Sequence, residues 1–232
     1  MKSAEGIRVP DYLGPTGRRI ANEDPLYFAM YAARYKFVAR MVTGLKHIVE
    51  IGAGDGFGAN FLSAVASDVV CIDIDQSQTE DCQNRFDSKH NLKFICHDLI
   101  SGPVGGLRGC FDALAMVDVI EHIYPDEQSS FLENSFALLA QHGFAIIGTP
   151  NVEASRFAGE RSRRTHVNLH SAGSLRLALS SYFSNVLSFG MNDEVLHTGF
   201  HGMSHYLWAI AFGLKERVDR GLTGVALPED AS

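Results

Sequence analysis

The stretch Ile48-Val49-Glu50-Ile51-Gly52-Ala53-Gly54-Asp55-Gly56-Phe57-Gly58-Ala59-Asn60 decides the fold of this 232-residue chain. An apolar run ends in an acidic turn with glycine at alternate positions, and apolar residues then recur at helical spacing up to Val65. This pattern predicts a strand, a tight turn and a helix. Because glycine lets the backbone approach a ligand closely, we expect a cofactor loop here.

The charge of this turn indicates the kind of ligand. A pyrophosphate at a helix N-terminus favours neutral or positive surroundings, whereas Glu50 and Asp55 make the turn acidic. A dinucleotide fingerprint is matched only by Gly54, Gly56 and Ala59, which are displaced from the strand end where that motif begins. The turn therefore favours a cationic ligand, with a purely structural glycine turn as the alternative.

The turn resembles the first motif of class I S-adenosylmethionine-dependent methyltransferases, an apolar strand followed by E/D-x-G-x-G-x-G. Glu50, Gly52, Gly54 and Gly56 fill that motif. S-adenosyl-L-methionine carries a sulfonium and an ammonium but no phosphate, so it suits an acidic loop. The resemblance extends over roughly residues 25–212 and implies this cofactor, with S-adenosyl-L-homocysteine as product.

The ends of later strands supply the remaining expected cofactor residues. Asp73 lies 19 residues after Gly54 at the tip of the second strand, where a carboxylate can bind ribose hydroxyls. Asp75 is the competitor for this role, although its position also suits the N-cap of a helix over 76–85. By the resemblance, Asp98 accepts from the adenine amino group and Asp118 faces the donor. The full expected set is Glu50, Gly52, Gly54, Asp55, Gly56, Asp73, Ile74, Asp98, Leu99 and Asp118.

Short apolar runs alternate with helical segments from residue 45 onward, which predicts an α/β fold. We expect a Rossmann-like, doubly wound sheet of seven strands with helices on both faces, mostly parallel; the resemblance implies that the last strand is antiparallel. The expected organisation is an N-terminal cap or lid and helix over 1–44, a core over 45–213 with an acceptor-side insert at about 151–171, and a polar tail over 214–232. Further predicted strands cover 68–75, 92–96, 111–117, 144–148, 183–189 and 206–212, and predicted helices cover 25–42, 126–139 and 172–182.

Composition narrows the choice of partners. The net charge is −7 and the acidic residues are spread along the chain, so neither nucleic acid nor a membrane is an expected partner. The chain has no charged leader with an apolar core and no apolar run of membrane-spanning length, which favours a cytoplasmic location. The four cysteines, Cys71, Cys82, Cys96 and Cys110, form no C-x-x-C pair and are predicted to be buried thiols.

The segment between Pro150 and Ser171 is the most basic part of the chain. Arginine forks match phosphate or carboxylate bidentately, so this segment predicts a small-molecule acceptor with an anionic group, such as a phosphorylated or nucleotide-linked sugar. A solvated loop whose arginines pair with nearby acids is the alternative. The oligomeric state, monomer or homodimer, stays open. The arginines concerned are Arg156, Arg161, Arg163 and Arg164.

Histidine is the natural general base if the methyl acceptor is an alcohol. His122 lies just beyond the fourth predicted strand and is the first candidate, although a structural role is the alternative. Three histidines recur at every fourth position between 197 and 205, but glycines between them predict a loop that lines the acceptor pocket. The other candidate catalytic residues are His166, His170 and His201.

Asp118-x-x-Glu121-His122 partly resembles a motif that holds a divalent metal in some branches of the family, with aspartate in place of the usual glutamate. We nevertheless expect no metal requirement. The predicted function is transfer of a methyl group to a hydroxyl of a small polar acceptor, and N-methylation stays open. The alternatives are an RNA 2′-O-methyltransferase with a divalent metal, a non-catalytic S-adenosylmethionine-binding protein and a NAD-dependent enzyme.

Overall fold

A computed structural model describes residues 12–216, apart from the side chain of Arg161. Its centre is one eight-stranded sheet with the strand order β3-β2-β1-β4-β5-β8-β6-β7. The first five strands run parallel to one another, and β8 runs antiparallel to both of its neighbours. The strands are β1 His47–Ile51, β2 Asp68–Asp73, β3 Leu92–Cys96, β4 Phe111–Val117, β5 Leu139–Pro150, β6 Phe183–Asn192, β7 Val195–His197 and β8 Tyr206–Leu214.

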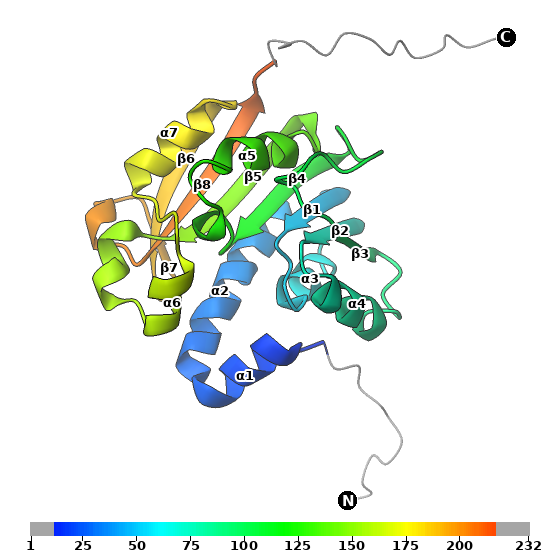
Figure 1. Cartoon of the computed structure of the whole chain (residues 1–232), viewed down its shortest axis with the longest axis horizontal. Coiled ribbons are helices and arrows are strands. Elements are labelled where there is room, and N and C mark those ends of the chain that lie inside the picture. Colours follow the sequence, from blue (N-terminus) through cyan, green and yellow to red (C-terminus); the bar gives the residue numbers. More distant parts are fainter. Residues whose placement is uncertain (1–11, 217–232) are drawn as a thin grey trace, which may run out of the picture.

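Helices cover both faces of the sheet (Figure 1). One core cluster joins α5 and α7 to the sheet, and a second joins α2, α3 and α4 to its other face. This is the expected doubly wound α/β fold, with the expected antiparallel last strand. The helices are α1 Pro15–Glu23, α2 Pro25–Val42, α3 Phe57–Leu62, α4 Gln76–Arg85, α5 Gln128–Phe136, α6 Glu160–Thr165 and α7 Ala172–Ser180, with 3-10 turns η1 Ile120–His122, η2 Val152–Phe157 and η3 His201–Met203.

The number of strands differs from the predicted seven because β6 turns back on itself as the short strand β7. Asn192 pairs with Val195 across a two-residue turn, and the first turn residue, Asp193, has a φ of 51°. Aspartate tolerates this left-handed conformation, which tight hairpins require. The sequence predicts a loop for the whole segment that precedes β8, whereas β7 occupies its first part.

Several element boundaries follow from capping groups. Asp24 accepts a hydrogen bond from the Tyr27 N–H and Pro25 opens α2, which covers the predicted residues 25–42. Asp75 accepts from the backbone of Ser77 and Gln78 and so caps α4. A hydrogen bond from the Gln78 side chain, together with those from the Gln78 backbone and from Ser77, lowers the pKa of Asp75 to about 2.

The cysteine prediction is half wrong. Cys71 in β2 and Cys82 in α4 are buried free thiols, whereas Cys96 and Cys110 are exposed. Cys96 is the last residue of the edge strand β3, and Cys110 directly precedes β4. No helix among residues 12–216 is long and apolar enough to cross a lipid bilayer. The predicted tail lies outside the described residues from 217 onward.

Candidate active site

The glycine turn after β1 adopts a backbone that only glycine adopts readily. Gly52 has a φ of 73°, and a Cβ there would collide with the Val119 side chain. Gly56 has a φ of 77°, and a Cβ there would lie 2.8 Å from the Phe86 ring. The turn is therefore packed between the β4 end and α4, and a side chain at either glycine would displace it.

Glu50 does not face the open side of this turn. It is 1% exposed, and its Oε2 accepts from the Cys71 thiol at 3.5 Å while its Oε1 has no partner. Burial raises the pKa of Glu50 to about 8, so the group is largely protonated at neutral pH. The sequence predicts a direct attraction between Glu50 and a cationic ligand. The structure instead buries Glu50 against Gly58 of α3, because helices cover both faces of the sheet at β1.

Asp55 is also engaged by the protein itself. Its Oδ2 accepts from the Gly17 N–H at 2.7 Å, in the first turn of α1. Its backbone carbonyl accepts a hydrogen bond from the Arg85 guanidinium. Asp55 thus ties α1 to the glycine turn, which gives the predicted N-terminal cap a physical anchor. In Figure 1, α1 lies at the lower end of α2.

Asp73 is the last residue of β2, and its carboxylate accepts hydrogen bonds from two backbone segments. Its Oδ2 accepts from the Gly54 N–H at 2.7 Å and its Oδ1 from the Asp75 N–H at 2.9 Å. The next residue, Ile74, is 66% exposed. The Asp73 carboxylate is therefore fixed against the glycine turn, and the residue that follows it, Ile74, has an exposed apolar side chain.

Asp98 and Leu99 follow β3 and have different roles in the structure. Asp98 is half-buried and its Oδ1 accepts from the Ile100 N–H at 2.8 Å. The Leu99 side chain is 4% exposed and belongs to the core cluster of α5 and α7. Only the backbone of Leu99 is therefore available to a ligand.

Asp118, directly after β4, is held by a residue that no sequence motif singled out. Its Oδ2 accepts from Arg34 Nη1 at 2.7 Å, and the Arg34 guanidinium lies 4.0 Å from the centre of the Tyr206 ring. Asp118 Oδ1 is buried without a hydrogen-bond partner, as is the Tyr206 hydroxyl. These groups come from α2, the β4 end and β8 and form one buried polar cluster. The sequence does not single out Arg34, because α2 also contains the charged residues Lys36 and Arg40, which are exposed in the structure.

Glu121, His122 and His166 come together beside this cluster. Each offers a ligand atom, and these atoms lie within 4.8 Å of one another. Glu121 is 0% exposed, and burial next to Asp118 raises its pKa to about 8. The rings of His122 and His166 are 5.0 Å apart, and burial beside His122 lowers the pKa of His166. The segment 151–171 therefore reaches the turn after β4.

The hydrogen bonds of His122 define which of its ring nitrogens is free. His122 Nδ1 lies 2.9 Å from the Thr165 carbonyl oxygen. A carbonyl oxygen only accepts hydrogen bonds, so Nδ1 carries the proton and Nε2 of the neutral ring keeps its lone pair. This nitrogen can accept a proton or ligate a metal.

The other two candidate histidines lie outside this group. His170 is 6% exposed, with Nε2 2.8 Å from Gln128 Oε1 and Nδ1 3.2 Å from Ser174 Oγ. Both ring nitrogens are therefore used within the protein, which makes this histidine a structural one in this geometry. His201 lies in η3, and its carbonyl accepts from Asn151 Nδ2 at 2.9 Å, while its Nδ1 is buried without a partner.

The basic insert forms a hollow of about 320 Å³ that reaches the histidine pair. Arg163 Nη2 donates to the Arg156 carbonyl at 3.1 Å, and none of the ion pairs within residues 12–216 involves Arg156, Arg163 or Arg164. The alternative interpretation, in which these arginines pair with nearby acids, thus has no such ion pair among the described residues, and the Arg161 side chain lies outside the described part. The hollow is lined by Ser155, Arg156, Ala158, Ser162, Arg163, His166 and Leu169.

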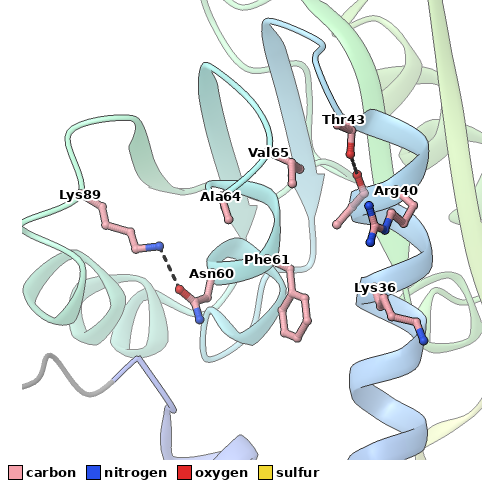
Figure 2. Close-up of a pocket in the computed structure, with 9 residues that line it drawn as sticks. Lys36, Arg40, Thr43, Asn60, Phe61, Ala64, Val65 and Lys89 are labelled. Atoms are coloured by element: carbon pink, nitrogen blue, oxygen red, sulfur yellow. Dashed lines mark hydrogen bonds between the residues drawn. The ribbon is translucent and has the colours of Figure 1, made fainter.

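Another hollow, of about 380 Å³, lies between α2 and α3 (Figure 2). Lys89 donates to Asn60 on one side of it, and Lys36 and Arg40 of α2 lie on the other. None of its lining residues is a candidate site residue, and it reaches Val65, just before β2 begins. It is therefore separate from the candidate site, which is built at the ends of the parallel strands.

Comparisons with known proteins agree with this geometry. Residues 48–143 match the family model of a methyltransferase domain. A probable S-adenosylmethionine-dependent methyltransferase from Mycolicibacterium smegmatis is 25% identical over 84% of this chain and 71% of its own length. A ubiquinone biosynthesis O-methyltransferase from Coxiella burnetii is 24% identical over 61% of this chain and 57% of its own length. The DhpI-SAH complex has the same fold, with a TM-score of 0.62 at 15% identity over 84% of this chain and 89% of DhpI.

The doubly wound sheet, the glycine turn after its first strand and the acid at the tip of the second define a Rossmann-like protein of the class that binds nucleosides. Within that class, residues 48–143 match a methyltransferase-domain model, and the matching relatives indicate an S-adenosylmethionine-dependent methyltransferase. S-adenosylmethionine is its methyl donor, as the resemblance of the glycine turn implied.

Proposed function

We propose that the protein methylates a hydroxyl of a small polar acceptor that also carries a phosphate or carboxylate. The observation that carries this proposal is the hollow of the insert, in which Arg156 and Arg163 lie beside His166. Among residues 12–216 neither guanidinium forms an ion pair, and such groups suit an anion because arginine binds phosphate or carboxylate bidentately. The expected cytoplasmic location remains part of the proposal.

The proposed donor-binding site lies at the edge of the sheet formed by the carboxyl ends of β1, β2, β3 and β4. We assign the ribose to Asp73 and the edge of the adenine to Asp98 and the Leu99 backbone, while Ile74 supplies an exposed apolar surface. The bound donor supplies an electrophilic methyl group. Methyl transfer is an in-line displacement, so the main task of the protein is to align the acceptor oxygen with that group.

The proposed base is His122, with His166 as its partner. The lone pair of His122 Nε2 is free because Nδ1 is bonded to the Thr165 carbonyl. Burial, together with the His122 ring 5.0 Å away, lowers the pKa of His166 and so favours its neutral form. A neutral imidazole can then take the proton of the acceptor hydroxyl as the new bond forms.

A second candidate is a metal-assisted reaction, favoured by the grouping of Glu121, His122 and His166. Carboxylate and imidazole ligands suit several divalent metals, and a bound metal would lower the pKa of the acceptor hydroxyl. The two candidates differ in their response to chelation. Turnover that survives dialysis against EDTA supports the histidine base, and turnover restored only by added Mg²⁺ or Mn²⁺ supports the metal.

The experiment that tests the proposed acceptor begins with labelled S-adenosylmethionine and a fractionated extract of the host. Once a methylated species is identified, Arg163→Gln is compared with Arg164→Gln, because Arg164 is exposed and does not line the hollow. Loss of a charged hydrogen bond worth about 1.5–3 kcal/mol should raise the acceptor KM about tenfold or more for Arg163→Gln only. An acceptor KM unchanged by Arg163→Gln, or an acceptor without an anionic group, would remove the proposal.

A further inference from the structure

Arg34 is a buried cation that the proposed chemistry does not use. It lies in α2, 84 residues from Asp118 in sequence, and is 9% exposed. A buried charge needs a partner, and Asp118 Oδ2 supplies one at 2.7 Å. The guanidinium also stacks 4.0 Å from the Tyr206 ring centre, so its orientation is fixed from two sides.

The partner of this cation has an unusual backbone. Asp118 has a φ of 57°, and Asp193 in the β6–β7 turn is the other non-glycine residue of the described range with positive φ. A residue with a side chain persists in this conformation only where its surroundings fix it. The Asp118 N–H donates to the Gly148 carbonyl at 3.0 Å, and Arg34 holds the side chain.

The turn that starts at Asp118 contacts both halves of the candidate site. Val119 packs where a Cβ of Gly52 would lie, so it supports the glycine turn. Three residues after Asp118 comes Glu121, whose carbonyl accepts from the Val167 N–H of the insert, and the ring of the next residue, His122, contacts Thr165. A change in the Asp118 backbone would therefore move the donor loop and the histidine pair relative to each other.

We propose that Arg34 is a positioning residue for methyl transfer: it holds the Asp118 turn in its left-handed conformation and so aligns the glycine turn with His122. Arg34 acts through Asp118 and contacts neither donor nor acceptor. This inference rests on the proposed placement of the reaction at the Asp118–His122 turn.

The test uses the full-length protein and the variants Arg34→Met, Arg34→Lys, Asp118→Asn and the double variant Arg34→Met/Asp118→Asn. Arg34→Met alone leaves the Asp118 charge without its partner and could prevent folding. The double variant removes both charges of the pair, so its activity can be measured in that case. Arg40→Met is the control, because Arg40 lies on the same helix, is exposed and faces the separate hollow of Figure 2.

We expect Arg34→Met to lower kcat about tenfold or more while the Kd of S-adenosylhomocysteine by calorimetry changes less than about threefold. Arg34→Lys should restore part of kcat, and the double variant should be no slower than the slower single variant, because both changes break the same contact. Arg40→Met should match the wild type. An unchanged kcat in Arg34→Met or in the double variant would overturn the proposal.

Two further readouts distinguish a positioning role of Arg34 from direct binding of the donor. A Kd for S-adenosylhomocysteine that rises tenfold or more in Arg34→Met, at unchanged kcat, would mean that Arg34 binds the donor itself and would overturn the proposal. Hydrogen exchange of residues 117–123 in the complex with S-adenosylhomocysteine needs no acceptor. Faster exchange there in Arg34→Met supports positioning even if the proposed acceptor is wrong, and unchanged exchange contradicts it.

Discussion

A carboxyl group without access to water lies directly beneath the cofactor loop. Glu50 is part of the glycine motif, yet its side chain is buried and accepts a hydrogen bond from Cys71 of the neighbouring strand β2. Its value to the fold is as a protonated, hydrogen-bonding group, since burial disfavours the charged form. Asp118 is ion-paired with Arg34, so neither Glu50 nor Asp118 presents an unpaired negative charge at the loop.

The buried Glu50 makes stability depend on pH. Its pKa is about 8 in the folded protein against an ordinary value of 4.5, so between these pH values the folded protein holds a proton that the unfolded chain has released. Stability should then fall as pH rises through this window, by up to about 1.4 kcal/mol per pH unit from this group. Glu50→Gln should reduce that slope in urea unfolding at pH 5.5 to 7.5, and the exposed Glu194→Gln should not. Equal slopes for wild type and Glu50→Gln would contradict the prediction.

A second prediction concerns His122, the proposed general base of the histidine pair. If His122 Nε2 takes the acceptor proton, His122→Ala should lower kcat about 100-fold or more with an unchanged donor Kd, since general base catalysis contributes about 10²–10⁴-fold. His170→Ala is the comparison, because both nitrogens of His170 are bonded within the protein. Its effect should appear in thermal stability more than in kcat. A loss of less than about tenfold for His122→Ala would exclude it as the base.

Among the secondary-structure elements, those with clear end signals matched their predicted boundaries. The predicted helices 25–42 and 76–85 coincide with α2 and α4, and each begins at a capping aspartate. Ser171 caps α7 with a capping box that includes Ser174. The predicted strand 144–148 is longer in the structure because β5 begins at Leu139 and pairs with both β4 and β8. Pairing partners of this kind leave no local signal in the sequence.

The packing of α1 against the glycine turn predicts that α1 supports the donor site. Gly14 precedes α1, and a Cβ there would lie 2.5 Å from the Asp55 Cβ. Gly14→Ala should therefore push α1 off the glycine turn and weaken binding of S-adenosylhomocysteine about tenfold, since such overpacking costs about 1–3 kcal/mol. Calorimetry measures this. Gly102→Ala is the control, because nothing lies within 4 Å of its added Cβ. Equal affinities for both variants would show that α1 does not support the donor site.

At the scale of the whole molecule, ligand binding should stabilise the fold in a selective way. S-adenosylhomocysteine at about 100 times its Kd should add about 2.7 kcal/mol to the free energy of unfolding, while NAD⁺ at the same concentration should add nothing. Thermal unfolding with each ligand measures this. Stabilisation by NAD⁺ instead would revive the dinucleotide alternative, and salt-sensitive binding of RNA would revive the nucleic-acid one.

The sequence by itself determined the fold class, the glycine turn and the methyl donor, because these depend on local patterns: alternation of strands and helices, glycine at positions of positive φ, and acids at strand ends. Only the tertiary structure decided which charges face a ligand. The helices on both faces of the sheet bury Glu50, α1 binds Asp55, and α2 brings Arg34 to Asp118. These pairings join residues tens of positions apart, and their partners are chosen by packing, which no local pattern encodes.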